Sequence, residues 1–290
     1  MKKLLKRVFL ALLLPPLTRA INPITQSQLA SEYWHLRTES ANKIPGAPPN
    51  FGYKIHSQCD EDGILQNIIS RLAFDPGLCT FLEVGAGDGR ENNTALLVNI
   101  LGWRGVWVDP SDQMKNFAQL VGPQSSLQII TNKLSPDSDF SSLFNALDKV
   151  GCKPGNNGRS IGVLSLDIDS YDLDLLETLL SYLDPEILVL EYNASFPPPI
   201  QTRINYEDTS TWEGDNFYGA SLSAQEVALR DKYMLVGTSM SGVNSFWVKN
   251  SHSKLFPKYP VEELYNPPRY HLTQLKWGHP ANSIKWLKKV

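Results

Sequence analysis

The sequence has few cysteines and little net charge. Cys59, Cys79 and Cys152 are odd in number and match the spacing of neither a zinc site nor a disulfide framework. The formal net charge is only −3 at pH 7, which indicates no broad basic surface and disfavours RNA or DNA as a partner. The histidines all lie outside the predicted strand ends, so we expect neither a Ser-His-Asp triad nor a histidine metal site.

Acidic residues are absent before Glu32, and the apolar run in this region is too short to cross a bilayer as a helix. Lysine and arginine are frequent in the first seven residues, and an apolar stretch broken by Pro15 follows them. This pattern predicts that residues 1–20 contact a membrane surface from the cytoplasmic side. The alternative is a signal peptide or organellar presequence cleaved near Ala20, which would make the protein secreted or organellar.

A glycine-rich turn follows an apolar run that predicts a strand. The segment FLEVGAGDGR contains Gly85, Gly87 and Gly89, and Asp109 follows about twenty residues after the last of them, as in nucleotide-binding folds. Glycine is required where a strand turns sharply into a helix or where the backbone approaches a ligand closely. The dinucleotide fingerprint needs a third small residue at the position of Arg90, so NAD is disfavoured.

Apolar runs and amphipathic stretches alternate from Ser57 onward, which predicts parallel strands joined by helices on both faces of a sheet. We expect strands at residues 80–84, 104–109, 126–131, 161–167, 186–192, 233–238 and 243–248. We expect helices at residues 92–101, 112–121, 138–150, 172–183 and 221–232, preceded by one that begins after Ser57. The pattern therefore predicts a doubly wound, mostly parallel, seven-stranded α/β fold that ends in an antiparallel hairpin.

Composition divides the chain into four parts. Residues 56–249 contain the alternating strands and helices and form the predicted ligand-binding domain. Residues 1–22 are the basic and apolar segment, residues 23–55 are an N-terminal arm with a proline-rich linker, and residues 250–290 are a C-terminal extension. The linker, residues 44–51, reads IPGAPPNF, and this density of proline and glycine indicates a break between regular elements.

Polar side chains follow two neighbouring strands of the predicted sheet. Asp167, Asp169 and Tyr171 come after the fourth strand, while Glu191 and Asn193 come at the end of the fifth. Ligands of open α/β sheets bind beyond the carboxyl ends of the strands, so these residues are candidates for the site. Period-two alternation puts Asp167 and Asp169 on the same side of an extended segment.

Three interpretations of these carboxylates stay open. Asp167 could contact the cofactor or take a proton from a substrate hydroxyl while Asp169 shapes the pocket. Alternatively, Asp167, Asp169 and Glu191 could hold Mg²⁺ or Ca²⁺, since hard cations prefer oxygen ligands. In the third interpretation, Asp169 and Asp172 cap the helix that begins near Leu173, which leaves Asp167 unexplained.

A long segment, residues 196–221, separates the fifth strand from the next helix. It contains Tyr206, Trp212, Phe217 and Tyr218 among several acidic residues, and a loop of this length is usually functional. Aromatic rings beside carboxylates suit a polyhydroxylated ligand, whose C–H faces stack while its hydroxyls form hydrogen bonds. Equally, the aromatic side chains could serve to pin the loop.

Several motifs together resemble the FkbM-like family of class I S-adenosylmethionine (SAM)-dependent methyltransferases. They are Ser57-Gln-Cys-Asp-Glu-Asp-Gly63, Glu83-Val-Gly-Ala-Gly-Asp-Gly89 with Asn92-Asn-Thr94, Gly102-Trp-Arg-Gly105, Ser165-Leu-Asp-Ile-Asp169, Glu191-Tyr-Asn193 and Gly242-Val-Asn244. The resemblance spans about 190 residues, which makes it more specific than one glycine motif. It departs from the family at Cys59, where a small or aromatic residue is frequent.

The resemblance implies a Rossmann-like methyltransferase fold and O-methylation of a hydroxyl on a glycan or small secondary metabolite. The alternative is a non-catalytic scaffold or assembly protein of the same fold at a membrane. The implied cofactor is SAM, and a divalent cation is the less favoured addition. The implied SAM-binding residues are Glu83, Gly85, Gly87, Asp88, Gly89 and Asp109; Asp167 is the implied catalytic residue, and Asp169, Tyr171, Glu191 and Asn193 are the candidates for acceptor binding.

Overall fold

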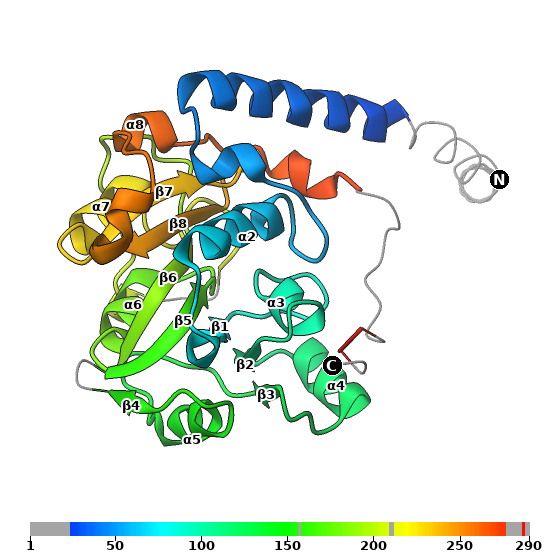
Figure 1. Cartoon of the computed structure of the whole chain (residues 1–290), viewed down its shortest axis with the longest axis vertical. Coiled ribbons are helices and arrows are strands. Elements are labelled where there is room, and N and C mark those ends of the chain that lie inside the picture. The colour runs from blue at the N-terminus through cyan, green and yellow to red at the C-terminus, as the bar shows by residue number, and fades with distance from the viewer. Residues whose placement is uncertain (1–23, 156–157, 209–211, 277–285, 288–290) are drawn as a thin grey trace, which may run out of the picture.

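A mixed β-sheet forms the centre of the computed structural model, which describes residues 24–155, 158–208, 212–276 and 286–287 (Figure 1). The strands follow in the spatial order β3-β2-β1-β5-β6-β8-β7, and the two-residue strand β4 pairs with β5. Their bounds are β1 Thr80–Val84, β2 Arg104–Val108, β3 Leu127–Ile130, β4 Pro154–Gly155, β5 Gly158–Leu166, β6 Leu183–Glu191, β7 Tyr233–Thr238 and β8 Asn244–Lys249. The order brings the carboxyl ends of β1, β2, β5 and β6 to the same edge of the sheet.

The direction of the strands confirms the predicted fold class. Strands β1, β2, β3, β5 and β6 pair in parallel, whereas β8 runs antiparallel to both β6 and β7. All five residues of β1 are buried, as expected of a parallel strand that helices cover on both faces. The protein therefore has the doubly wound, Rossmann-like α/β fold that ends in an antiparallel hairpin.

Two apolar clusters lie on opposite faces of this sheet. Their helices are α2 Glu61–Leu72, α3 Ala95–Asn99 and α4 Asp112–Val121 on one face, and α5 Ser141–Lys149, α6 Asp172–Leu179 and α7 Leu222–Leu229 on the other. Trp107 and Trp247 are fully buried, and their indole N–H groups donate to Thr94 Oγ1 and Ser245 Oγ. These bonds matter because a buried donor without a partner would cost about 1–3 kcal/mol.

Several boundaries differ from the sequence prediction, and two of the differences have a clear cause. Helix α3 begins at Ala95 rather than at 92, because the polar groups of residues 92–94 bind Glu83 instead of starting the helix. Strand β6 begins at Leu183 rather than at 186. Pro185 is tolerated near the beginning of this strand because pairing with β8 starts only at Ile187.

The N-terminal arm is mostly helical and packs against the C-terminal extension. Residues 24–43 form a long helix, which lies next to the short helix η5 Tyr270–Gln274 in Figure 1. Gln26 donates to the carbonyl of Gln274, and the side chains of Tyr33 and Leu272 share a third apolar cluster with Met240. This cluster ties both ends of the described chain to the turn between β7 and β8.

The predicted linker is packed against the domain rather than extended. Helix η1 (Pro48–Phe51) lies on β7 so closely that a Cβ atom at Gly237 would overlap the ring of Pro49. The remaining short elements are η2 Pro76–Leu78, η3 Tyr206–Asp208, η4 Asn250–Leu255 and α8 Val261–Leu264. Residues 44–51 thus form part of the core structure.

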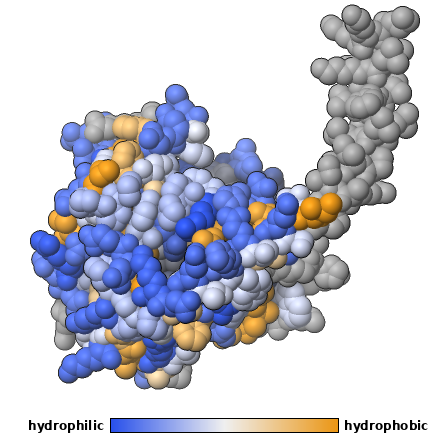
Figure 2. Space-filling view, turned by 90° about the horizontal axis from the view of Figure 1, so that it is seen from above, coloured by the Kyte–Doolittle hydropathy of each residue, from blue (hydrophilic) through white to orange (hydrophobic). Residues whose placement is uncertain are grey.

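Apolar side chains on the face shown in Figure 2 form small separate patches on a largely hydrophilic surface. Among the helices that the structure describes, none combines the length and apolar character needed to cross a bilayer. The basic segment, residues 1–20, lies outside the described residues. Its contact with a membrane surface therefore stays a prediction.

Candidate active site

The glycine loop turns sharply after β1 and presents its backbone to a cavity. Gly85 has φ +88°, and a Cβ atom there would overlap the carbonyl oxygen of Asp167, so no larger residue fits. Gly87 has φ +58°, and its N–H donates to Asp109 Oδ2 over 2.8 Å. The loop is therefore held between the ends of β2 and β5.

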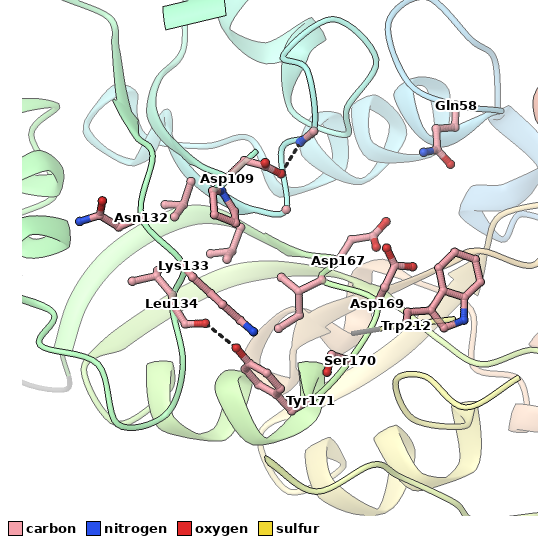
Figure 3. Close-up of a pocket in the computed structure, with 16 residues that line it drawn as sticks. Gln58, Asp109, Asn132, Lys133, Leu134, Asp167, Asp169, Ser170, Tyr171 and Trp212 are labelled. Atoms are coloured by element: carbon pink, nitrogen blue, oxygen red, sulfur yellow. Dashed lines mark hydrogen bonds between the residues drawn. The ribbon is translucent and has the colours of Figure 1, made fainter. Parts of the chain in front are cut away.

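Asp109 follows β2 and is nearly buried. Its Oδ1 accepts from the N–H of Ser111 over 2.8 Å, while Oδ2 accepts from Gly87. Each carboxylate oxygen still has a free lone pair, because a carboxylate has about four acceptor sites. The side chain lines a cavity of about 500 Å³, here called the glycine-loop cavity, together with Gly85, Gly87, Lys133, Asp167 and Tyr171 (Figure 3).

Three predicted cofactor residues lie off the wall of this cavity. The carboxylate of Glu83 is buried and accepts four hydrogen bonds, from Asn92 Nδ2, from the N–H groups of Asn93 and Thr94, and from Thr94 Oγ1. Asp88 is exposed and accepts from the N–H of Arg90, while Gly89 packs against Phe117. These three residues shape the loop, whereas Gly85, Gly87 and Asp109 face the cavity, and a contact of the three with the cofactor stays a prediction.

The segment after β5 is a tight turn rather than an extended strand. Asp169 adopts φ +54°, a left-handed conformation that is uncommon outside glycine, so period-two alternation does not describe it. Asp172 stabilises the turn, because Oδ1 accepts from the N–H of Ile168 over 2.8 Å and Oδ2 from that of Ser170 over 3.0 Å. The capping interpretation is wrong for Asp169, whose side chain caps no helix.

The turn brings three carboxylates together, here called the acidic cluster: Asp167, Asp169 and Glu191. One oxygen atom of each lies within 4.8 Å of those of the other two. Burial raises the pKa of Asp167 well above its ordinary value, and the charges of Asp169 and Asp172 add to the effect. Burial, followed by the charge of Asp167, does the same for the pKa of Glu191. Asp167 and Glu191 also share a hydrogen bond, so one proton between them relieves their repulsion.

A second cavity of about 630 Å³ lies on the other side of the acidic cluster. We call it the aromatic cavity, because Trp212, Tyr218 and Tyr270 contribute to its wall. The hydroxyls of Tyr218 and Tyr270 are 2.5 Å apart, and Trp212 donates its indole N–H to the carbonyl of Asp215. The aromatic side chains thus pin the loop, as one interpretation of the sequence expected, and also face the cavity.

Both cavities share Gln58, Asp167, Asp169 and Trp212 in their walls. In Figure 3, Asp167 and Asp169 lie together in the region between Gln58 and Trp212. The two cavities therefore adjoin each other at Asp167 and Asp169.

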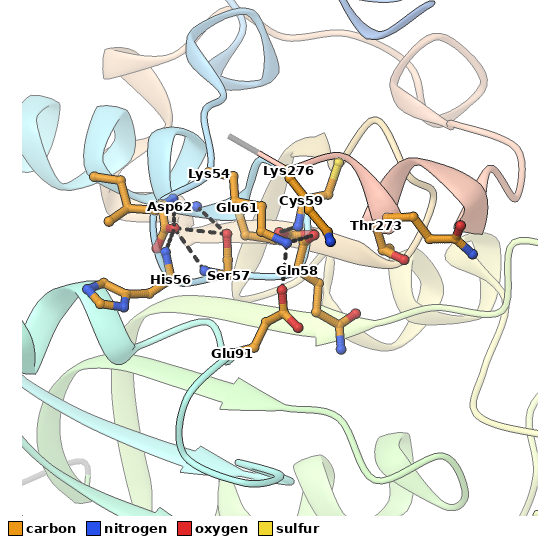
Figure 4. A network of polar contacts seen from close by, with 12 residues as sticks. Lys54, His56, Ser57, Gln58, Cys59, Glu61, Asp62, Glu91, Thr273 and Lys276 are labelled. Carbon is orange, nitrogen blue, oxygen red and sulfur yellow. Dashed lines mark hydrogen bonds and ion pairs between the residues drawn. The ribbon is translucent and has the colours of Figure 1, made fainter. Parts of the chain in front are cut away.

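Gln58 reaches both cavities from a loop that buried carboxylates hold in place (Figure 4). Asp62 Oδ2 accepts from the N–H groups of Ile55, His56 and Ser57, at 2.6, 2.6 and 2.9 Å. Glu61 Oε2 accepts from the N–H of Cys59 over 2.7 Å. The acids in the first turn of α2 thus fix a loop in addition to favouring the helix dipole.

Sequence reasoning did not identify Gln58, Tyr270 and Thr273 as site residues. Gln58 belongs to the SQCDEDG motif, but its neighbours in this motif predict only the start of a helix. Tyr270 and Thr273 line the aromatic cavity from η5, which packs beneath residues 24–43. That contact joins segments more than 200 residues apart, so no local sequence pattern predicts it.

The remaining candidates differ in their positions. Tyr171 lines the glycine-loop cavity, and its hydroxyl donates to the carbonyl of Leu134 over 2.9 Å. Burial raises the pKa of Tyr171 to about 12, so it stays neutral near pH 7. Asn193 is buried behind the aromatic cavity, where Nδ2 donates to the carbonyls of Asn216 and Tyr218. Asn193 therefore supports the loop, and its contact with the acceptor stays a prediction.

Four motif residues from distant segments meet in one buried polar network. Asn93 Nδ2 donates to Ser165 Oγ over 3.1 Å, and Asn244 Nδ2 lies 3.5 Å from both Asn93 Oδ1 and Glu61 Oε1. The network joins α2, the turn before α3, β5 and β8 beneath the carboxyl edge of the sheet. Its polar groups specify how these elements pack, because each would be costly to bury alone.

No protein-family model matches the sequence, and none of the curated proteins is significantly similar to it. Solved structures that match include a SAM-dependent methyltransferase from Aquifex aeolicus, with 14% identity over 63% of this chain and 87% of that one, at a TM-score of 0.34. A SAM-dependent methyltransferase from Clostridium acetobutylicum shares 10% identity over 68% and 92% of the two chains, at 0.38. An O-methyltransferase family 2 protein from Planctomyces limnophilus, in complex with apigenin, shares 17% identity over 78% and 61%, at 0.34. We therefore rest the assignment of function on the site itself.

Proposed function

We propose that this protein is a SAM-dependent methyltransferase that transfers the methyl group to a hydroxyl oxygen. The observation that carries the proposal is the arrangement of two adjoining cavities that share Asp167 in their walls. The glycine-loop cavity has the backbone turn and the Asp109 carboxylate that a nucleoside with a charged tail requires. The aromatic cavity provides a separate space for the acceptor.

Each part of SAM has a suitable partner in the glycine-loop cavity. Gly85 and Gly87 leave the backbone open to the methionine portion, and the free lone pairs of Asp109 accept from the ribose hydroxyls. Asp167 lies where the cavity meets the acceptor side, so the methyl group would point toward the aromatic cavity. A volume of about 500 Å³ is within the usual range for cofactor sites.

Methyl transfer requires alignment and the removal of one proton. The acceptor oxygen forms a bond to the methyl carbon while the carbon–sulfur bond breaks, and its electron pair returns to sulfur to give neutral S-adenosylhomocysteine. The hydroxyl proton passes to the carboxylate of Asp167, which burial has made a stronger base than an exposed aspartate. Positioning of the two reactants supplies the larger part of the acceleration, because the sulfonium is already activated.

The acceptor is a neutral polyhydroxylated molecule, such as a glycan or a secondary metabolite. Among the described residues of the aromatic cavity there is no lysine, arginine or histidine, so an anionic group would lack a counter-charge there. The carboxylates in its wall can accept hydrogen bonds from hydroxyls. The rings of Trp212, Tyr218 and Tyr270 offer apolar faces to sugar C–H groups. Both features suit a hydroxylated acceptor.

We also propose that the chain belongs to the FkbM-like family. The buried network of Glu61, Asn93, Ser165 and Asn244 supports this proposal, because it unites residues from four of the motifs that carry the resemblance. Action at the cytoplasmic surface of a membrane, through residues 1–20, remains part of the same proposal.

The direct test is calorimetry of the purified protein with SAM, S-adenosylhomocysteine and NAD, followed by release of S-adenosylhomocysteine with a panel of oligosaccharides and polyols. We expect both adenosyl ligands to bind and NAD to fail. Asp167→Asn should bind SAM like the wild type and turn over about 100-fold more slowly, the lower range for loss of a general base.

Binding of NAD without either adenosyl ligand would overturn the assignment. Binding of SAM without turnover on any acceptor would instead favour the non-catalytic scaffold of the same fold. A folded Asp167→Asn variant with the turnover of the wild type would remove Asp167 from the chemistry.

A further inference from the structure

Within the acidic cluster, Glu191 is buried, Asp167 is half-buried and Asp169 is exposed. Among the described residues the cluster has no N–H or O–H donor from outside it, unlike the buried carboxylates of Glu83, Asp62 and Asp172. Glu83 accepts four hydrogen bonds, Asp62 Oδ2 accepts three from backbone N–H groups, and Asp172 accepts two. Within the described part of the chain, Asp167, Asp169 and Glu191 form no ion pair and no hydrogen bond beyond the one between Asp167 and Glu191. Their negative charge is therefore left for something other than the protein to balance.

Glu191 provides a second observation at the same place. Its side chain is only 8% exposed, and its Oε2 is buried without a hydrogen-bond partner among the described residues. A buried carboxylate oxygen without a partner costs free energy, which proteins avoid unless a ligand or ion completes the site. Glu191 comes from the end of β6, so its carboxylate approaches the Asp167–Asp169 turn from a separate strand.

The geometry points to a divalent-cation site, in which Asp167, Asp169 and Glu191 bind Mg²⁺, Mn²⁺ or Ca²⁺ through one oxygen atom each. Oxygen atoms within 4.8 Å of one another can surround one such ion, whose bonds to oxygen are about 2.0–2.6 Å long. The ligand set is all carboxylate, which suits hard cations and disfavours zinc or copper, since those prefer nitrogen and sulfur.

The position of the site gives the cation a role with the acceptor. Three protein ligands leave open coordination positions, because Mg²⁺ takes six ligands and Ca²⁺ six to eight. Asp167 and Asp169 line both cavities, so these open positions face the space between cofactor and acceptor. Two neighbouring hydroxyls of a polyol could occupy them, which makes a vicinal diol the favoured acceptor class. This role rests on the proposed function, whereas the binding of the cation does not.

The test uses the full chain after treatment with a chelator and dialysis. Calorimetry with MgCl₂, MnCl₂ and CaCl₂, one at a time and without SAM, should show one bound ion per chain for at least one metal. Asp169→Asn and Glu191→Gln should each weaken this binding at least tenfold. Asp215→Asn is the matched control, because Asp215 lines the aromatic cavity outside the acidic cluster, and it should bind the cation like the wild type.

Circular dichroism and thermal unfolding of each variant separate loss of the site from loss of the fold. If no metal binds to the wild type, or if binding survives both cluster substitutions, the cation site is refuted. A parallel titration with SAM keeps the two proposals apart: a bound cation with no affinity for SAM would support the cation site and reject the methyltransferase. Binding of SAM without any cation would reject the cation site alone.

Discussion

Carboxylates of two kinds lie at the same edge of this sheet. Glu83 and Asp172 are surrounded by N–H and O–H donors, which fix the turns that follow β1 and β5. Asp167 and Glu191 lack such donors among the described residues and have only each other, with Asp169 beside them. The first kind stabilises the fold, whereas the second kind is retained at a cost in stability.

The contrast teaches that burial alone does not identify a functional acid. Burial raises the pKa of Glu83 as it raises those of Asp167 and Glu191. What distinguishes them is the supply of donors, because hydrogen bonds to the ionised form lower the pKa again and offset the loss of hydration. An acid that keeps its charge unbalanced needs a proton, a substrate or a cation.

The largest expected effect comes from making the same substitution in both kinds of acid. In Glu83→Gln, the new amide NH₂ faces N–H and O–H groups that are themselves donors, so hydrogen bonds are lost. We therefore expect a loss of about 3 kcal/mol in the free energy of unfolding. Glu191→Gln removes repulsion with Asp167 and should leave the free energy of unfolding unchanged or higher. Urea unfolding of the two variants, without cofactor or metal, measures both. Equal losses would abolish the distinction between the two kinds of carboxylate.

Asp109 is intermediate, since it accepts two backbone N–H groups and still faces the glycine-loop cavity. Asp109→Ala should weaken SAM binding by about 1.5–3 kcal/mol, because a charge-assisted bond to the ribose is lost. It should also lower the free energy of unfolding by about 1 kcal/mol, because the N–H of Gly87 loses its acceptor. Calorimetry and urea unfolding check the two effects. An unchanged dissociation constant in the folded variant would exclude the ribose contact.

The smallest effect concerns Asp60, whose hydrogen bonds from Met240 and Tyr33 are long, at 3.2–3.4 Å. Burial raises the pKa of Asp60 well above its ordinary value. A carboxyl whose pKa is raised by folding stabilises the protein at low pH, and this stabilisation is lost as the pH rises through its pKa in the folded state. Asp60→Asn should therefore gain stability relative to the wild type as the pH rises above the ordinary pKa of aspartate.

Urea unfolding of both proteins across this rise in pH measures the difference between them, so contributions common to both, such as that of the buried His56, cancel. A difference that stays constant with pH would mean that Asp60 does not titrate in this way.

The fold and the cofactor side of the site could be predicted because their signals are local. The alternation of strands and helices, the glycine spacing and the position of Asp109 each occupy a short stretch of sequence, and the hairpin at Gly242 was also foreseen. Local signals do not show how a side chain is used in the fold. Glu83 ends the strand with a carboxylate, as a ligand contact would, yet it accepts four hydrogen bonds from three residues of the following turn.

Part of the aromatic cavity could not be predicted, because it depends on contacts between distant segments. Tyr270 reaches this cavity only because η5 packs beneath residues 24–43, and the turn that carries Asp169 is left-handed rather than extended. Neither the packing of an irregular tail nor one backbone angle leaves a periodic pattern. The number of hydrogen-bond donors around a carboxylate, which distinguishes Glu83 from Glu191, likewise depends on the three-dimensional structure.

Much of the wall of the aromatic cavity comes from two separate stretches of chain, Asp215–Tyr218 and Tyr270–Thr273, neither of which lines the glycine-loop cavity. Mutations in one stretch can therefore accumulate without disturbing the strand-to-helix turn that would hold the cofactor. Over evolutionary time, such an arrangement lets descendants exchange one acceptor for another in small steps while the group they donate stays the same.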